Sequence, residues 1–251
     1  MLLYVYIAVS LILDGVLSGF CGLVNSWADI WIVLVLFIGL FLGILILHVI
    51  FAVVFSLFID KGKRPDSLDT FVRRFALCTL DLYLRLIRVK VHASGMEKLP
   101  EGRFLLVSNH RTQIDPIIGL VLFRKQKVAF ISKKENFKIP FGGRYIAALG
   151  CLALDRDDPR AAIKTIGDAA DMIKNDVASI GIYPEGGTNR TEETVLPLHS
   201  GSFKIAQKAG VPVVVSTIAG TRDVKKKMVI HRSHVYVDIV DVISREETAR
   251  L

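Results

Sequence analysis

Positive charge is absent from the first 60 residues of this 251-residue sequence. No Lys or Arg precedes Lys61, and Asp14 and Asp29 are the acidic residues of the first 59 positions. The remaining 32 basic and 22 acidic residues give residues 60–251 a formal charge of +10. A basic region behind an apolar one predicts a partner that is negatively charged and close to a membrane. Nucleic acid would match the charge but not the apolar region, so it is not expected as a partner.

Cysteine is also scarce. Cys21, Cys78 and Cys151 form no Cys-x-x-Cys pair, which argues against a disulfide framework and indicates a reducing compartment. Gly-x-Ser-x-Gly, Walker-type and zinc-protease patterns are absent as well. His231 and His234 have the spacing of a metal pair, but no carboxylate or cysteine is spaced to complete a site. A basic turn next to a strand is therefore predicted there, and no metal site.

A long uncharged run predicts a membrane helix. Residues 30–59 contain no formally charged side chain, and about 20 apolar residues are enough to cross a bilayer. Residues 2–24 are a weaker candidate because Asp14 lies in their middle, where a carboxylate costs roughly 2.5–3.5 kcal/mol to insert. Two arrangements are open: a helical hairpin that turns at residues 25–29, or a first segment that lies shallow in one leaflet. Residues 1–60 are expected to form the membrane segment, with one or two helices.

Basic residues predict how the chain is oriented. Lys61, Lys63 and Arg64 directly follow the apolar run, and positive charge favours the cytoplasmic side. The domain of residues 61–251 is therefore expected on the cytoplasmic face of the membrane. A second basic group, Arg222 with residues 225–227, is expected to be a solvated charge run, with guidance of an acidic donor as the alternative.

Alternating short apolar runs and helical patterns predict an α/β domain. Its largely parallel central sheet would be flanked by helices, with chemistry at the carboxyl ends of the strands. Before it, Leu68 and Phe71 begin an amphipathic pattern that reads either as a helix packed on the core or as one lying at the membrane interface. Expected strands are residues 104–108, 128–132, 151–154, 179–183, 211–218 and 235–242, and expected helices are residues 117–124, 159–174 and 203–209.

One strand-to-helix loop, residues 108–116, contains a candidate catalytic pair. Asp115 before Pro116 is a good helix start, with the aspartate as N-cap and proline in the first turn. That explanation leaves His110 unaccounted for. A loop of this length can fold back so that the carboxylate holds one imidazole nitrogen protonated and leaves the other free as a base. Such a base can deprotonate a hydroxyl that attacks a thioester.

A second loop, residues 182–190, follows another expected strand. Its glycines allow a ligand to approach the backbone closely, and Glu185 offers a carboxylate to a hydroxyl or a basic neighbour. Thr188 and Arg190 supply hydrogen-bond donors suited to a phosphate. Taken alone, this stretch also reads as an ordinary polar turn.

Together these blocks resemble the 1-acylglycerol-3-phosphate acyltransferases, also called lysophosphatidate acyltransferases. The resemblance covers residues 104–220 in order and spacing. The matching positions are Asn109, His110 and Asp115 of an Asn-His-x4-Asp motif, a block from Lys133-Lys134-Glu135 to Leu154-Asp155-Arg156, the motif Pro184-Glu185-Gly186, and the strand start Val211-Pro212.

The resemblance implies a reaction and its participants. His110 would be the general base, Asp115 would orient it, and Arg156 with the Glu185–Gly186 loop would contact the acceptor phosphate. The acyl group would move from acyl-carrier protein or coenzyme A to the sn-2 hydroxyl of lysophosphatidic acid, giving phosphatidic acid, with no cofactor, metal or covalent acyl-enzyme. Alternatives are glycerol-3-phosphate or another lysolipid as acceptor, or a non-catalytic membrane protein that binds anionic lipid and has no need of His110.

The sequence departs from the family at one point. The family has Glu-Gly-Thr-Arg where this chain has Glu185-Gly186-Gly187-Thr188-Asn189-Arg190. Either a glycine is inserted, or Gly187 and Thr188 replace the threonine and arginine, and then Arg190 would supply the positive charge. The identity of the acceptor depends on this loop. Candidate substrate-binding residues are Lys133, Arg156, Glu185, Gly186, Gly187, Thr188 and Arg190.

Overall fold

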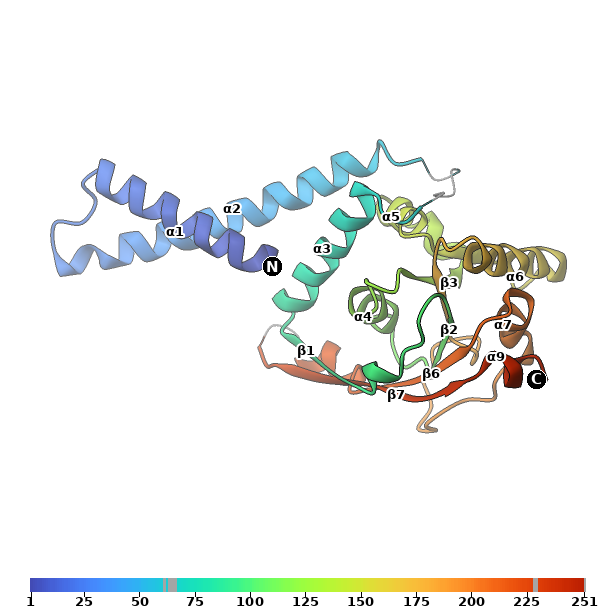
Figure 1. Ribbon diagram of the computed structural model, residues 1–251. Coiled ribbons are helices and arrows are strands. Elements are labelled where there is room, and N and C mark those ends of the chain that lie inside the picture. Colours follow the sequence, from blue (N-terminus) through green and yellow to red (C-terminus); the bar gives the residue numbers. More distant parts are fainter. Residues whose placement is uncertain (61, 63–66, 228–229, 251) are drawn as a thin grey trace. The chain divides into compact units, whose positions relative to one another are not determined.

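A computed structural model describes residues 1–60, 62, 67–227 and 230–250 (Figure 1). The chain divides into two compact units, Met1–Ile59 and Asp60–Leu251. Lys61, Lys63 and Arg64, on which the predicted orientation rests, lie outside the described residues.

The N-terminal unit is a helical hairpin. Helices α1 (Leu2–Phe20) and α2 (Ile30–Ser56) are joined through the short helix η1 (Trp27–Asp29), and both are long and apolar enough to cross a membrane. The Tyr6 hydroxyl lies 2.8 Å from His48 Nδ1 across the pair. Ser10, Asp14 and Ser18 follow Tyr6 at four-residue intervals and are buried, so this polar stripe of α1 lies against α2. This packing shields the Asp14 carboxylate, which accepts a hydrogen bond from Ser18.

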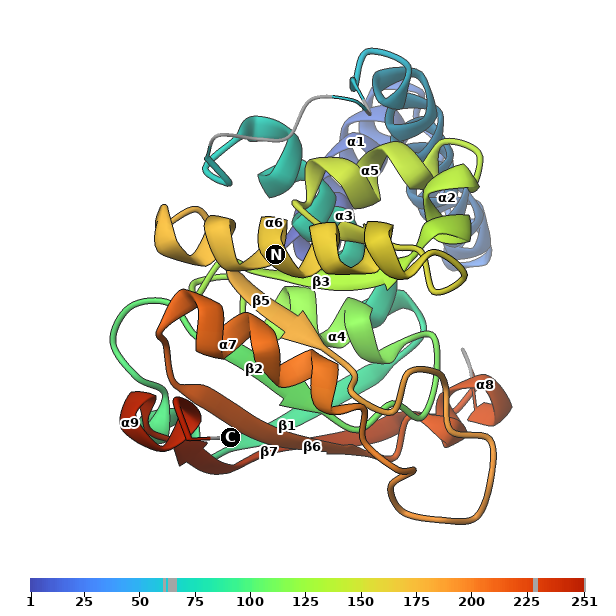
Figure 2. The same ribbon diagram turned by 90° about the vertical axis from the view of Figure 1, so that its right-hand side faces the viewer.

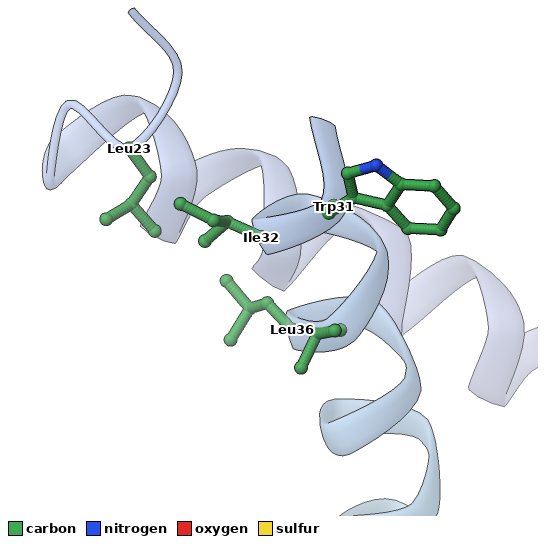
Figure 3. Close-up of a pocket in the computed structure, with 5 residues that line it drawn as sticks. Leu23, Trp31, Ile32 and Leu36 are labelled. Carbon is green, nitrogen blue, oxygen red and sulfur yellow. The ribbon is translucent and has the colours of Figure 1, made fainter. Parts of the chain in front are cut away.

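The outer surface of the hairpin is apolar. Near its turn, an open hollow is lined by the side chains shown in Figure 3, among them Leu23, Trp31, Ile32 and Leu36. Trp31 is 69% exposed and Trp27 is 88% exposed, although both carry large apolar rings. Exposed apolar side chains over two long helices, with tryptophans at one end, indicate a segment inserted in a membrane.

The second unit contains a seven-stranded sheet in the order β1-β7-β6-β2-β5-β3-β4. Neighbouring strands are parallel except for the antiparallel pair β6–β7, which confirms the predicted α/β class with a largely parallel sheet. The strand β1, at the edge of the sheet, was not predicted. The strands are β1 (Val89–Ser94), β2 (Leu105–Ser108), β3 (Val128–Lys133), β4 (Leu152–Leu154), β5 (Ser179–Ile182), β6 (Val213–Ala219) and β7 (Ser233–Ile243).

Helices cover both faces of this sheet (Figures 1 and 2). Side chains alternate along β2, so Leu106 joins the core cluster that contains α3 and α4 residues, and Leu105 joins the cluster that contains α6 and α7 residues. The helices of this unit are α3 (Phe71–Leu86), α4 (Asp115–Leu122), α5 (Gly142–Ala148), α6 (Pro159–Lys174), α7 (Lys204–Ala209), α8 (Arg222–Lys227) and α9 (Arg245–Thr248), with the short helices η2 (Met96–Lys98), η3 (Lys134–Lys138) and η4 (Ser200–Phe203).

Helix α3 packs on the core with part of the face that its sequence predicts, because Leu68, which precedes it in the same pattern, and Leu82 are buried. Ala76 and Leu84 join the core cluster, whereas Phe71, expected on that face, is 67% exposed. The inward face also includes Arg73, whose buried guanidinium donates to the carbonyls of Leu149 (2.5 Å) and Val128 (3.0 Å). Burial lowers the pKa of Arg73. The sequence pattern does not predict the burial of Arg73, because the carbonyls that allow an arginine to be buried lie far away in the sequence.

Candidate active site

The site lies at the carboxyl ends of the parallel strands β2, β5 and β6. Directly after β2, the side-chain amide of Asn109 donates to the carbonyl of Ile218 (3.1 Å) and accepts from its N–H (2.7 Å). This side chain therefore prolongs the pairing of β2 with β6 by one residue beyond the strand. It fixes the point at which the loop leaves the sheet, and His110 is the next residue.

His110 and Asp115 meet as the loop length predicts. The distance from His110 Nδ1 to Asp115 Oδ2 is 3.0 Å, and the carboxyl group is 1% exposed. The same Oδ2 accepts the N–H groups of Arg111 (2.6 Å) and Thr112 (2.7 Å), while Oδ1 accepts the Thr112 hydroxyl (2.8 Å). An acceptor with no hydrogen of its own requires a proton on Nδ1, so the neutral ring carries its free lone pair on Nε2.

The predicted capping role of Asp115 is wrong. Asp115 is the first residue of α4, with Ile114 at the N-cap position, and its carboxylate makes its hydrogen bonds to the preceding loop. Pro116 is in the first turn of the helix, as predicted. The start of α4 thus fixes the backbone of Asp115, and the Asp115 side chain binds His110.

Two aromatic rings stack beneath the imidazole. Tyr183 lies 4.2 Å from His110 between ring centroids at an interplanar angle of 17°, and Phe130 stacks on the other side of Tyr183 at 5.3 Å. Burial raises the pKa of Tyr183 well above its ordinary value, and the negative charge of Asp115 raises it further. The phenol is therefore neutral, and the stack restricts rotation of the base. A signal for Tyr183 exists in the sequence, because it follows β5 directly and precedes the Pro-Glu-Gly motif.

Glu185 connects the two loops of the site. Its Oε1 accepts the backbone N–H of His110 at 2.6 Å, and its Oε2 accepts that of Leu196 at 2.9 Å. The side chain is 6% exposed, so this carboxylate is used to hold backbone in place. The neighbouring Gly186 has φ +72°, and a Cβ there would come within 2.7 Å of the His199 ring. Glycine is required at 186 for both reasons.

Thr188 is next to the second ring nitrogen of His110. Its hydroxyl oxygen lies 3.3 Å from His110 Nε2, the nitrogen on the opposite side of the ring from Asp115. The following residue, Asn189, is fully buried, and its N–H donates to the carbonyl of His110 at 2.7 Å. The loop that departs from the family pattern is therefore bonded to the histidine loop at several points.

A family model described as Acyltransferase matches residues 89–219, slightly more than half of the 251 residues. The chain belongs to this acyltransferase family. The match contains every loop described above, and the resemblance predicted from the motifs is confirmed.

Two relatives of this chain are 1-acyl-sn-glycerol-3-phosphate acyltransferases by name. A 1-acyl-sn-glycerol-3-phosphate acyltransferase of Saccharomyces cerevisiae is 27% identical over 178 residues, which are 70% of this chain and 58% of that protein. The chloroplastic enzyme BAT2 of Brassica napus is 36% identical over 53% of this chain and 38% of its own length. The chain thus spans less than two thirds of these relatives. The crystal structure of the 1-acyl-sn-glycerophosphate (LPA) acyltransferase PlsC from Thermotoga maritima has a TM-score of 0.56 and 25% identity, covering 78% of this chain and 77% of that one.

The basic residues of the candidate site differ in how they are held, and Lys134 and Arg156 lie close to the glycine loop or to the turn beside it. Lys134 pairs with Asp155 (2.7 Å) and Asp157 (3.1 Å), which raises the pKa of the lysine and lowers that of Asp155. These ion pairs hold the turn that carries the exposed Arg156, and Arg156 Nη1 lies 4.0 Å from the place a Cβ would take at Gly187.

The other candidates for phosphate binding are more dispersed. Lys133 is exposed at the carboxyl end of β3. Arg190 is exposed too, and among the described residues it makes no hydrogen bond or ion pair with the other predicted site residues. The structure therefore brings Arg156 next to the glycine loop.

Two arginines fasten the loop after Thr188. Arg222 donates to the carbonyls of Asn189 (3.0 Å) and Thr191, and Arg111 donates to those of Glu193 (2.5 Å) and Thr194 (3.3 Å). The expectation that Arg222 belongs to a solvated charge run is therefore wrong, because carbonyls of a distant loop bind its guanidinium. Spacing in the sequence carries no signal for this role.

The histidine pair considered for metal binding has a different partner. His234 Nδ1 lies 2.8 Å from His92 Nε2 on the neighbouring strand β1, and the rings stack. Among the described residues, no group of three or more His, Cys, Asp or Glu side chains is placed to hold a metal ion. Cys151 was expected within a strand and lies directly before β4, and it is buried in the core.

Proposed function

We propose that this chain transfers a fatty acyl group from a thioester to the sn-2 hydroxyl of lysophosphatidic acid, forming phosphatidic acid in phospholipid biosynthesis. One observation carries the proposal: a buried carboxylate holds Nδ1 of His110, so that Nε2 is available as a base. The names of the relatives support the choice of acceptor.

In the proposed reaction, Nε2 of His110 takes the proton of the acceptor hydroxyl as its oxygen attacks the thioester carbonyl. The carbon–sulfur bond then breaks, and the imidazolium returns the proton to the leaving thiolate. Asp115 stabilises the imidazolium and keeps its orientation. General base catalysis of this kind contributes roughly 10²–10⁴-fold to a rate. No cofactor takes part, and coenzyme A or acyl-carrier protein supplies the acyl group.

The acceptor phosphate would bind between Arg156 and the loop of Gly186 and Gly187. The guanidinium is exposed next to Gly187, where the absence of a side chain leaves room for a ligand. Lys133 adds positive charge at the neighbouring strand end. In this proposal Arg190 is not needed for the phosphate, and Glu185 acts by holding the loop.

Acceptor and product are membrane lipids, so the hairpin would keep the enzyme where both reside. The positive charges of Lys61, Lys63 and Arg64 support a catalytic domain on the cytoplasmic face. The test is labelling with a membrane-impermeant reagent of a cysteine introduced in residues 67–70, in a variant whose native Cys21 and Cys78 are replaced by serine. Labelling of intact cells would place the domain outside.

The function itself is tested with the purified full chain in mixed micelles. Labelled acyl-coenzyme A and acyl-carrier protein are supplied with lysophosphatidic acid, glycerol-3-phosphate or lysophosphatidylcholine. We expect transfer to lysophosphatidic acid, loss of at least ~10²-fold in kcat for His110→Ala, and normal rates for the control His231→Ala. Faster transfer to another acceptor would change the assigned substrate. Lipid binding without turnover by the wild type would favour the non-catalytic alternative.

A further inference from the structure

The hydroxyl of Thr188 occupies the position that an acceptor hydroxyl must reach. It lies 3.3 Å from His110 Nε2, and Nε2 is the acceptor nitrogen because Nδ1 donates to Asp115. The Thr188 hydroxyl therefore donates to the lone pair that the reaction uses. At 3.3 Å this hydrogen bond is longer than the roughly 2.7–3.2 Å that is usual between nitrogen and oxygen in proteins. It is weak enough to be displaced.

Thr188 is held there by its neighbours on both sides. Glu185 accepts the N–H of His110, and Asn189 donates to the carbonyl of His110. Both backbone groups of the catalytic histidine are thus bonded to the loop that carries Thr188. Asn189 is also held by a residue outside this loop, because its carbonyl accepts a hydrogen bond from Arg222 at 3.0 Å. The position of Thr188 is therefore coupled to that of the base.

An acyltransferase must discriminate between an acceptor hydroxyl and water. When water takes the place of the acceptor, it loses a proton to Nε2, its oxygen attacks the carbonyl, the carbon–sulfur bond breaks, and fatty acid and free thiol result. Water is present in large excess, so the bound thioester needs protection while the acceptor is absent. A hydroxyl that is part of the protein can block the base without leaving as product.

We propose that Thr188 is a specificity-determining residue that occupies Nε2 until the acceptor displaces it, and so suppresses hydrolysis of the acyl thioester. The acceptor gains binding energy from its phosphate and acyl chain, and this energy can displace the weak hydrogen bond between Thr188 and His110. Water has no such groups and gains no such energy. The inference rests on the proposed function, because it assumes that His110 activates an acceptor hydroxyl.

Three substitutions separate the hydroxyl from the volume of the side chain. Thr188→Ser keeps the hydroxyl, Thr188→Val keeps the shape without it, and Thr188→Ala removes both. Thr194→Ala is the matched control, because Thr194 is exposed in the same loop and its side chain does not contact His110. The measured quantity is the ratio of fatty acid released to phosphatidic acid formed, with and without lysophosphatidic acid.

We expect Thr188→Ala to raise this ratio roughly tenfold, which corresponds to ~1.4 kcal/mol of lost discrimination. Thr188→Ser should keep the wild-type ratio, Thr188→Val should lie between the two, and thermal unfolding should show that all variants are folded. An unchanged ratio in Thr188→Ala, beside normal transfer by the wild type, would overturn the inference alone. An acyl adduct on Thr188 in the intact mass would also overturn it, since the hydroxyl would then be a nucleophile. A wild type that neither transfers nor hydrolyses would refute the proposed function and this inference together.

Discussion

Asp115→Asn separates the two contributions of the buried carboxylate, to structure and to catalysis. Three of its four hydrogen bonds converge on Oδ2, from His110 Nδ1 and the N–H groups of Arg111 and Thr112. If the amide oxygen takes the Oδ2 position, all three donors keep an acceptor. The new NH2 group then faces the Thr112 hydroxyl, which can rotate to accept instead of donating.

The cost in stability should therefore be modest. Hydrogen bonds to a charged acceptor contribute about 1.5–3 kcal/mol against about 1 kcal/mol for neutral ones, but the variant no longer pays to desolvate a carboxylate. We expect a net loss of ~1–3 kcal/mol, and about 2–4 °C in Tm for each kcal/mol in a domain of this size. Catalysis should suffer more, because a neutral amide cannot stabilise an imidazolium, and kcat should fall roughly 10²–10⁴-fold.

The assay compares kcat at saturating donor and acceptor with Tm of the same preparation. Thr112→Val is the matched control, because it removes the Oδ1 contact and leaves the three Oδ2 contacts in place. It should lower Tm with little effect on kcat. The reasoning is refuted if Asp115→Asn lowers Tm but retains the kcat of the wild type, since the carboxylate would then serve the loop alone.

Two further predictions concern the groups that hold the base. Glu185→Gln leaves the N–H of either His110 or Leu196 facing an amide NH2 group, so it should destabilise the protein by about 2–3 kcal/mol. The control is Glu193→Gln, at an exposed position. Equal Tm values for the two variants would contradict the role of Glu185 in holding the loop. Tyr183→Phe keeps the stacked ring and should keep the wild-type pH profile. Because the pKa of Tyr183 is raised in the folded state, ionisation of the phenol lowers stability only as the pH rises above about 10. Tyr183→Leu removes the stack and should lower kcat, and an unchanged kcat would show that stacking does not position His110.

Local patterns in the sequence predicted most of the sheet, the family and the contact between His110 and Asp115. Short continuous apolar runs predicted β2, β3 and β5, because a strand that is covered on both faces of a sheet is apolar on both. The contact between His110 and Asp115 is also local. The two residues are five positions apart, and a loop of that length can fold back to bring them together. Motif order then identified the family without any knowledge of how the strands pair.

Tertiary structure alone decided the roles of residues whose partners are distant in the sequence. Arg73 is buried because the distant carbonyls of Val128 and Leu149 accept from it, and Arg222 fastens a loop that lies some thirty positions earlier. Thr188 reaches His110 because β5 pairs with β2, which brings the two strand ends to one edge of the sheet. A motif records which residue types are present. Which of them meet is determined by strand pairing, and that depends on the packing of the whole domain.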